Sequence, residues 1–195
     1  LACMLDWISG YSNVTYLDIE SGDYRKRLKE VNLDRPVWLF ATAFHYVNTH
    51  DLGLRIPLPP GSIVFETGGT KGKSRSVSRK ELFDIIEKVF DVSCSHVISE
   101  YGMSELASQA YSTGSKEGEE PILKFPDWVN TFVMTGMGGA SASGLGSLLV
   151  RDPFRVDYPY YFRTQDVVEL DSQGKFLFIG RAITAPIKGC SILAD

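Results

Sequence analysis

A glycine-rich segment of the kind that contacts nucleotides follows one of the apolar runs of the chain. Residues 66–74 have the sequence ETGGTKGKS, and Gly68 and Gly69 come directly after the run. Glycines let backbone amides approach a nucleotide because no Cβ stands in the way. A Walker A loop has one more residue between its first glycine and Gly-Lys-Ser than Gly68 allows. The segment therefore predicts a nucleotide contact of another type, with a glycine-rich surface turn as the alternative.

A second segment suited to nucleotide chemistry comes about thirty residues further along, at the end of the next predicted strand. It has the sequence Tyr101-Gly102-Met103-Ser104-Glu105. Ligands bind at strand ends in open α/β sheets. Tyr101 can stack on a base, Ser104 can donate to a phosphate, and Glu105 can hold Mg²⁺. The alternative is a turn followed by a helix cap.

Two further segments lie near the end of the chain. Residues 162–166 read FRTQD and a Gly-Arg pair ends at Arg181. The chain then finishes with Lys188-Gly189-Cys190-Ser191 inside the sequence IKGCSIL. A cysteine thiolate is a good nucleophile, and a neighbouring lysine favours the thiolate form. A small buried hydrophobe is the alternative role for Cys190.

The elements that must position these residues differ between the two halves of the chain. Apolar runs at 14–19, 36–41 and 62–66 alternate with charged or amphipathic helical stretches, which predicts βαβ units with a parallel sheet. Ser78 and Glu81 form a capping box for the helix that follows.

The second half has a different pattern. Residues 112–146 are rich in Gly, Ser, Glu and Pro, which predicts interrupted structure, and the last fifty residues contain short strand-like runs with tight turns. The predicted fold is therefore α/β: a parallel-sheet portion over residues 1–115 that binds nucleotide and acyl groups, then a small antiparallel β-rich subdomain over residues 116–195 that carries the cysteine motif.

Composition excludes several classes of protein. The formal net charge is −4, which argues against a nucleic-acid partner. No apolar run reaches the roughly 20 residues that cross a bilayer, so no membrane span is predicted. The three cysteines are widely spaced without a CxxC pair, which disfavours a disulfide framework and a structural zinc site. We expect a cytoplasmic protein.

The order of the four segments resembles that of the adenylate-forming superfamily, which includes the acyl-CoA synthetases and peptide-synthetase adenylation domains. The resemblance covers about residues 36–195 and implies that the enzyme uses ATP and Mg²⁺. It implies that the glycine loop lies against adenine, that Tyr101 stacks on it, that Glu105 binds the metal, and that Asp166 and Arg181 hold the ribose. The nucleotide-binding residues it implies are Gly68, Gly69, Tyr101, Gly102, Ser104, Asp166 and Arg181.

Within that superfamily the chain is most similar to the C-terminal part of LuxE-type acyl-protein synthetases. These activate a fatty acid and hold it on their own cysteine, and IKGCSIL resembles their C-terminal motif. The resemblance implies that Cys190 accepts the acyl group, that Lys188 assists it, and that an acyl-accepting reductase or carrier protein is the partner. The substrate is then a fatty acid or another carboxylic acid.

The chain also departs from the superfamily pattern. The Ser/Thr/Gly-rich phosphate loop that normally precedes these segments is absent, and Gln165 replaces a glycine. We therefore expect a fragment that is a poor catalyst of adenylation by itself. Two alternatives are a ligase that uses coenzyme A, similar to phenylacetate-CoA ligases, and a non-catalytic nucleotide-binding module.

Overall fold

The structure, a computed structural model, describes residues 9–10, 14–17, 24–68, 77–113, 119–136 and 138–182. Its helical elements are α2 (Tyr24–Glu30), α3 (Ala43–Asp51), α4 (Arg79–Phe90) and the short 3₁₀ helix η1 (Cys94–His96). Its strands are β1 (Trp38–Thr42), β2 (Ile63–Thr67), β3 (Val97–Tyr101), β4 (Ala110–Ser112), β5 (Ile122–Lys124), β6 (Asn130–Met134), β7 (Ala140–Ser141), β8 (Gly144–Arg151), β9 (Phe162–Leu170) and β10 (Lys175–Arg181).

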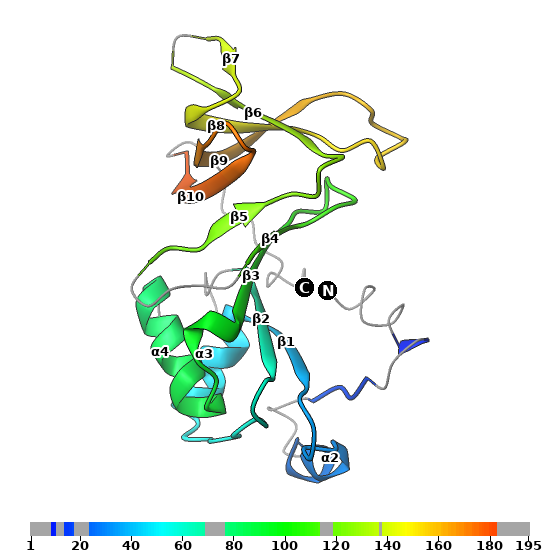
Figure 1. Cartoon of the computed structure of the whole chain (residues 1–195), viewed down its shortest axis with the longest axis vertical. Helices are drawn as coiled ribbons and strands as arrows, with labels where there is room; N and C mark the ends of the chain where they lie inside the picture. Colours follow the sequence, from blue (N-terminus) through cyan, green and yellow to red (C-terminus); the bar gives the residue numbers. More distant parts are fainter. Residues whose placement is uncertain are drawn as a thin grey trace, which may run out of the picture.

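The ten strands of the described residues belong to one mixed sheet, which runs through the molecule from β1 at one edge to β7 at the other (Figure 1). The order is β1-β2-β3-β4-β5-β10-β9-β8-β6-β7. β1, β2 and β3 are parallel, and every later pairing is antiparallel. The predicted α/β class, with parallel strands first and antiparallel strands after them, is confirmed.

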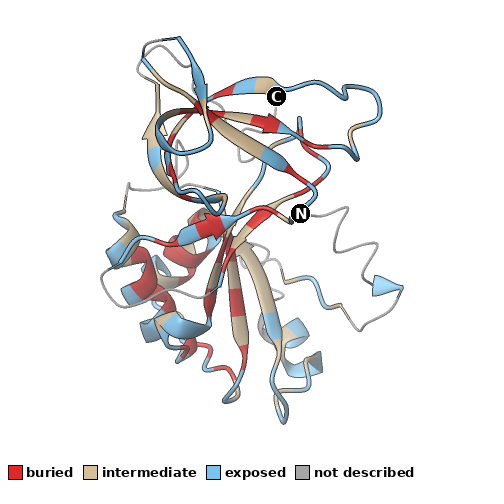
Figure 2. Cartoon of the chain, turned by 45° about the horizontal axis from the view of Figure 1, so that its top comes forward, coloured by how far each residue is buried: buried red, intermediate tan, exposed pale blue. Residues whose placement is uncertain are grey.

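Helices α3 and α4 cover one face of the parallel strands (Figure 1). Burial alternates along β2, where Val64 and Glu66 are buried and the residues between them are only partly so. This alternation places every second side chain under the helices. The helices contribute Tyr46 and Ile86 to a core that also contains Val64. Buried residues accordingly gather where helix and strand meet (Figure 2).

The antiparallel part has a core of its own. Leu148 and Val150 of β8, Val133 of β6 and Val168 of β9 are fully buried there, together with Phe176 of β10. Their spacing follows the two-residue period of strands that bury one face. The two cores correspond to the two patterns visible in the sequence.

The Ser78 N-cap of the predicted capping box of α4 is present. The Ser78 Oγ accepts a hydrogen bond from the Glu81 amide at 3.1 Å, which satisfies a backbone donor that the first turn leaves unpaired. At the other end Asp91 adopts the left-handed conformation with φ 57°. The helix thus begins after Ser78 and ends at Phe90.

Some predicted elements differ from the structure. Residues 14–17 form no strand, although they begin an apolar run. Among the short strand-like runs of the last fifty residues, those at 160–164 and 167–170 are joined in one long strand, β9. Short strands β5, β6 and β7 lie within the Gly/Ser-rich region, because neighbours in the sheet supply hydrogen bonds that local composition does not predict.

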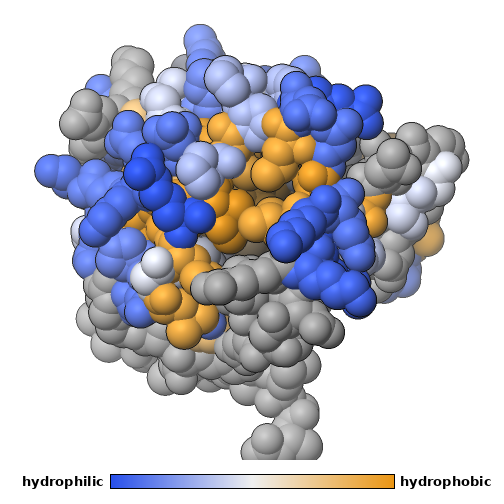
Figure 3. Space-filling view, turned by 90° about the horizontal axis from the view of Figure 1, so that it is seen from below, coloured by the Kyte–Doolittle hydropathy of each residue, from blue (hydrophilic) through white to orange (hydrophobic). Residues whose placement is uncertain are grey.

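The surface seen from below combines hydrophobic side chains near its centre with hydrophilic ones around them (Figure 3). Large apolar residues that are exposed include Trp38, which is 65% accessible, at the start of β1. Among the described residues, no helix is long and apolar enough to span a membrane.

Candidate functional site

Asp166 is the centre of the candidate nucleotide site. It lies on β9 and only 6% of it is exposed. The Tyr101 hydroxyl donates to its Oδ2 at 2.7 Å, and the Arg181 Nε donates to its Oδ1 at 3.0 Å. A buried carboxylate requires such partners, because burial without them costs several kcal/mol. Three residues predicted separately from the sequence are therefore in direct contact.

The sheet explains why these residues meet. Asp166 and Arg181 are paired across β9 and β10, so their side chains project from the same face of the sheet. Tyr101 ends β3, which reaches β10 through β4 and β5. The site therefore spans the junction between the parallel and the antiparallel strands.

Aromatic side chains hold the ring of Tyr101. Its centroid lies 5.5 Å from that of Phe176 and 6.0 Å from that of Phe125, both nearly edge-on. Such edge-to-face contacts favour a fixed ring orientation. Burial raises the pKa of the Tyr101 phenol, and the negative charge of Asp166 raises it further. Tyr101 is thus a neutral hydrogen-bond donor at physiological pH.

Thr164 is a member of the site that sequence analysis missed. It is buried, and its Oγ1 accepts a hydrogen bond from the Asp166 amide at 3.1 Å. A threonine two residues before an aspartate is a weak signal by itself, although Thr164 belongs to the FRTQD segment. Its contact fixes the backbone that carries the central carboxylate.

The arrangement fits a ribose. Among the described residues, one side chain donates to each oxygen of Asp166, and a carboxylate oxygen has two acceptor sites, so each oxygen has room for another donor. Vicinal ribose hydroxyls are donors of the required kind. Asp166 and Arg181 could therefore hold a ribose without losing their contacts to each other.

Gly102, Ser104 and Glu105 lie in the segment that joins β3 to β4, and all three are exposed. The Ser104 Oγ donates to Glu105 Oε2 at 3.1 Å. A Cβ on Gly102 would lie 3.2 Å from the Cγ of Gln109, which explains in part why a glycine is found there. The segment presents a carboxylate and a hydroxyl to solvent.

Glu105 is the residue predicted to bind Mg²⁺. Within the described ranges, no group of three or more His, Cys, Asp or Glu residues could hold a metal ion. Mg²⁺ commonly binds through one or two carboxylates together with substrate phosphates and water. Glu105 could therefore contribute to a metal site that the phosphates of a bound nucleotide complete.

The glycine loop is described only at its start. Gly68 follows β2 with φ 70°, a left-handed conformation in which other residues are strained, and a Cβ there would meet no atom within 4 Å. Gly69 lies outside the described residues, as do Cys190 and Lys188. The predicted roles of these three residues remain predictions.

A buried acidic residue beside the glycine loop was also missed. Glu66 of β2 is 1% exposed and forms an ion pair with Arg79 in the first turn of α4. Burial raises the pKa of the Glu66 carboxyl, and Arg79 opposes that shift. Next to it, Glu100 accepts hydrogen bonds from Thr67 and Tyr111, each at 3.0 Å. The sequence signal was a glutamate inside an apolar strand.

Several other residues with polar or reactive side chains lie outside the candidate site. His96 is exposed on η1 and its Nδ1 lies 3.2 Å from the Ser95 Oγ, which agrees with a surface role. Cys94 is partly buried against the first core. Tyr158 and Tyr160 are 48% and 69% exposed on the β8–β9 connection.

The fold of this chain is found in known proteins. No protein-family model and no curated protein matches the chain. Solved structures do match. A mutant coronafacic acid ligase from Pectobacterium brasiliense has a TM-score of 0.57 at 22% identity, over 84% of this chain and 32% of the ligase. The chain therefore shares its fold with about a third of this ligase.

Two more structures agree with this assignment. ATP-bound MatB from Rhodopseudomonas palustris matches 80% of the chain and 33% of its own length, with a TM-score of 0.52 and 15% identity. The amide bond synthetase McbA from Marinactinospora thermotolerans matches 79% of the chain and 33% of its own, with a TM-score of 0.51 and 16% identity. The chain thus spans about a third of the length of each of these three proteins.

Proposed function

We propose that the chain is part of an ATP-dependent ligase that activates a carboxylic acid as its acyl-adenylate. The observation that carries the proposal is the contact of Tyr101 and Arg181 with the buried carboxylate of Asp166, within a fold shared with adenylate-forming ligases. Asp166 and Arg181 would hold the ribose, and Tyr101 would line the nucleotide site. Gly68 and Gly69 would lie against the base.

The first step of the proposed reaction forms the acyl-adenylate. A carboxylate oxygen of the acid attacks the α-phosphorus of ATP, the acyl-phosphate bond forms, and pyrophosphate leaves. Mg²⁺, held by Glu105 and the phosphates, would neutralise negative charge at the phosphates. The Ser104 hydroxyl would donate to a phosphate oxygen. The product is a mixed anhydride, which a thiolate attacks readily.

The aromatic side chains on the sheet face opposite α3 and α4 favour an apolar carboxylic acid as the substrate. Phe40 and Phe65 are direct partners across β1 and β2, and their rings stack with centroids 4.3 Å apart. Both are partly exposed, whereas Val64, which precedes Phe65 in β2 and points to the helix-covered face, is fully buried. This surface ends at the hydroxyl and carboxylate groups of Thr67 and Glu100. A fatty or aromatic acid would suit it better than a charged one.

For the second step we propose that Cys190 is the acyl acceptor, as in LuxE-type acyl-protein synthetases. Its thiolate would attack the acyl carbon, the bond to AMP would break, and AMP would leave with the electron pair. Lys188 would favour the thiolate. A reductase or a carrier protein would then take the acyl group from the thioester.

The test of this function uses the longest protein that contains the chain, with ATP, Mg²⁺ and a radiolabelled fatty acid. Label should remain on the denatured protein, hydroxylamine should release it, and Cys190→Ala should abolish it while pyrophosphate release continues. Label that persists on Cys190→Ala would contradict the acceptor role. AMP release that depends on coenzyme A would favour the ligase alternative, and AMP binding without turnover would favour a nucleotide-binding module.

A further inference from the structure

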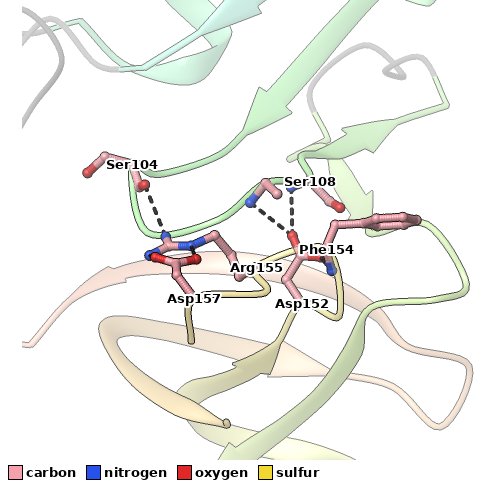
Figure 4. Close-up of polar contacts among 7 residues, drawn as sticks. Ser104, Ser108, Asp152, Phe154, Arg155 and Asp157 are labelled. Atoms are coloured by element: carbon pink, nitrogen blue, oxygen red, sulfur yellow. Dashed lines mark hydrogen bonds and ion pairs between the residues drawn. The ribbon is translucent and has the colours of Figure 1, made fainter. Parts of the chain in front are cut away.

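Asp152 is a buried carboxylate outside the residues that the proposed reaction uses. It follows the last residue of β8, at the start of the connection to β9, and is 1% exposed. No lysine or arginine forms an ion pair with it among the described residues. Backbone amides are its hydrogen-bond donors instead (Figure 4).

These amides come from two different parts of the chain. The Asp152 Oδ2 accepts hydrogen bonds from Ala107 at 3.0 Å and from Ser108 at 2.7 Å, and its Oδ1 accepts one from Phe154 at 3.1 Å. Hydrogen bonds to a charged acceptor are stronger than those between neutral groups. Asp152 therefore fastens the β8–β9 connection to the segment between β3 and β4, which is distant in sequence.

Arg155 makes a second connection between the same two parts. Its Nη1 donates to the carbonyl oxygen of Ser104 at 3.3 Å, while its Nε and Nη2 donate to the two carboxylate oxygens of Asp157 at 2.8 and 2.9 Å (Figure 4). A bidentate pair of this kind fixes the plane of the guanidinium. Arg155 thus contacts the backbone at Ser104 from a fixed orientation.

The two connections enclose the proposed phosphate- and metal-binding residues. Arg155 holds the backbone at Ser104, and Asp152 holds it at Ala107 and Ser108, with Glu105 between them. The segment contributes one backbone hydrogen bond of its own, from the Leu106 amide to the Met103 carbonyl at 3.1 Å. Its conformation therefore depends on contacts with the β8–β9 connection.

We propose that Asp152 and Arg155 are positioning residues for the metal–nucleotide site. They act through the backbone, by setting where Ser104 and Glu105 point, and touch neither nucleotide nor metal. This inference rests on the proposed function. Loss of a residue that orients a metal ligand typically lowers metal affinity by about 10- to 100-fold.

The test compares the affinity of the chain for ATP in excess Mg²⁺ with its affinity in EDTA, by titration calorimetry. The dissociation constant in EDTA divided by that in Mg²⁺ measures how much the metal strengthens ATP binding. We expect Asp152→Ala and Arg155→Ala to reduce this ratio by about tenfold. Asp152→Asn keeps one acceptor oxygen and should stay closer to wild type. Asp127→Asn, which removes an exposed carboxylate paired with Lys124, is the matched control.

Hydrogen exchange gives a readout that does not need a ligand. The amides of Ala107 and Ser108 should exchange faster in Asp152→Ala. If Asp152→Ala does not fold, the ATP affinities of Arg155→Ala test the proposal instead. The Arg155 side chain lies at the surface, so its loss should leave the protein folded. An unchanged ratio in folded variants overturns the positioning role alone. A wild-type chain whose ATP affinity does not respond to Mg²⁺ overturns the metal site of the proposed function, and the positioning role with it.

Discussion

Tyr101 and Asp166 are 65 residues apart in sequence, and a hydrogen bond of 2.7 Å joins the tyrosine hydroxyl to the aspartate carboxylate. Tyr101 ends the last parallel strand, whereas Asp166 lies within the antiparallel part. The contact therefore connects the two halves of the sheet at the candidate site. It also gives a buried carboxylate a neutral donor in addition to Arg181.

Tyr101→Phe tests this contact. The ring stays among Phe125 and Phe176, but Asp166 loses one donor, so we expect the free energy of unfolding to fall by about 1–2 kcal/mol. Urea denaturation measures the change. Tyr158→Phe, on the exposed β8–β9 connection, is the control and should be nearly neutral. Equal stability of Tyr101→Phe and wild type would show that the hydrogen bond contributes nothing.

Glu66 predicts a specific pH dependence of stability. Burial raises its pKa in the folded state above the ordinary value of 4.5, so the folded protein binds this proton more tightly than the unfolded chain does. The resulting contribution to stability is complete below the ordinary pKa and is lost as the pH rises through the folded pKa.

Glu66→Gln removes that titrating group while it keeps a similar shape. Measured from pH 4 upward, the stability of wild type should therefore fall relative to that of Glu66→Gln. Glu87→Gln, on the exposed side of α4, should follow wild type. A wild type that gains stability over Glu66→Gln as the pH rises would mean that Arg79 outweighs burial.

The cap of α4 gives a prediction about the helix that follows the glycine loop. Ser78→Ala removes the acceptor for the Glu81 amide and should lower the free energy of unfolding by about 1 kcal/mol. Ser78→Asp supplies another acceptor and should retain most of the stability. Urea denaturation of both variants checks this, and equal losses in the two would rule out the capping role.

Much of the parallel part could be predicted because its signals are local. The apolar run at 62–66 and the Ser78–Glu81 capping box are visible in neighbouring residues, and β2 and α4 lie where they indicate. Strands β4 and β5 have few local signals. They exist because β3 and β10 offer them hydrogen-bonding edges, which is information about tertiary structure.

The candidate site likewise contains residues that the sequence predicts and residues that it does not. Tyr101, Asp166 and Arg181 were identified by the order of their motifs, and the structure adds that they touch. Asp152 and Glu66 were missed because an isolated acidic residue has no motif. Their importance becomes visible only through burial and through partners on distant segments.

The most direct test of the account is the affinity of the chain for AMP, measured by titration calorimetry. We predict saturable binding by wild type that Asp166→Ala weakens by about 10- to 100-fold, since a hydrogen bond to a charged group contributes about 1.5–3 kcal/mol. Glu169→Ala, an exposed change on the same strand, should bind like wild type. Absence of AMP binding by the folded wild-type chain, or equal affinity in Asp166→Ala, would contradict a nucleotide site at Asp166.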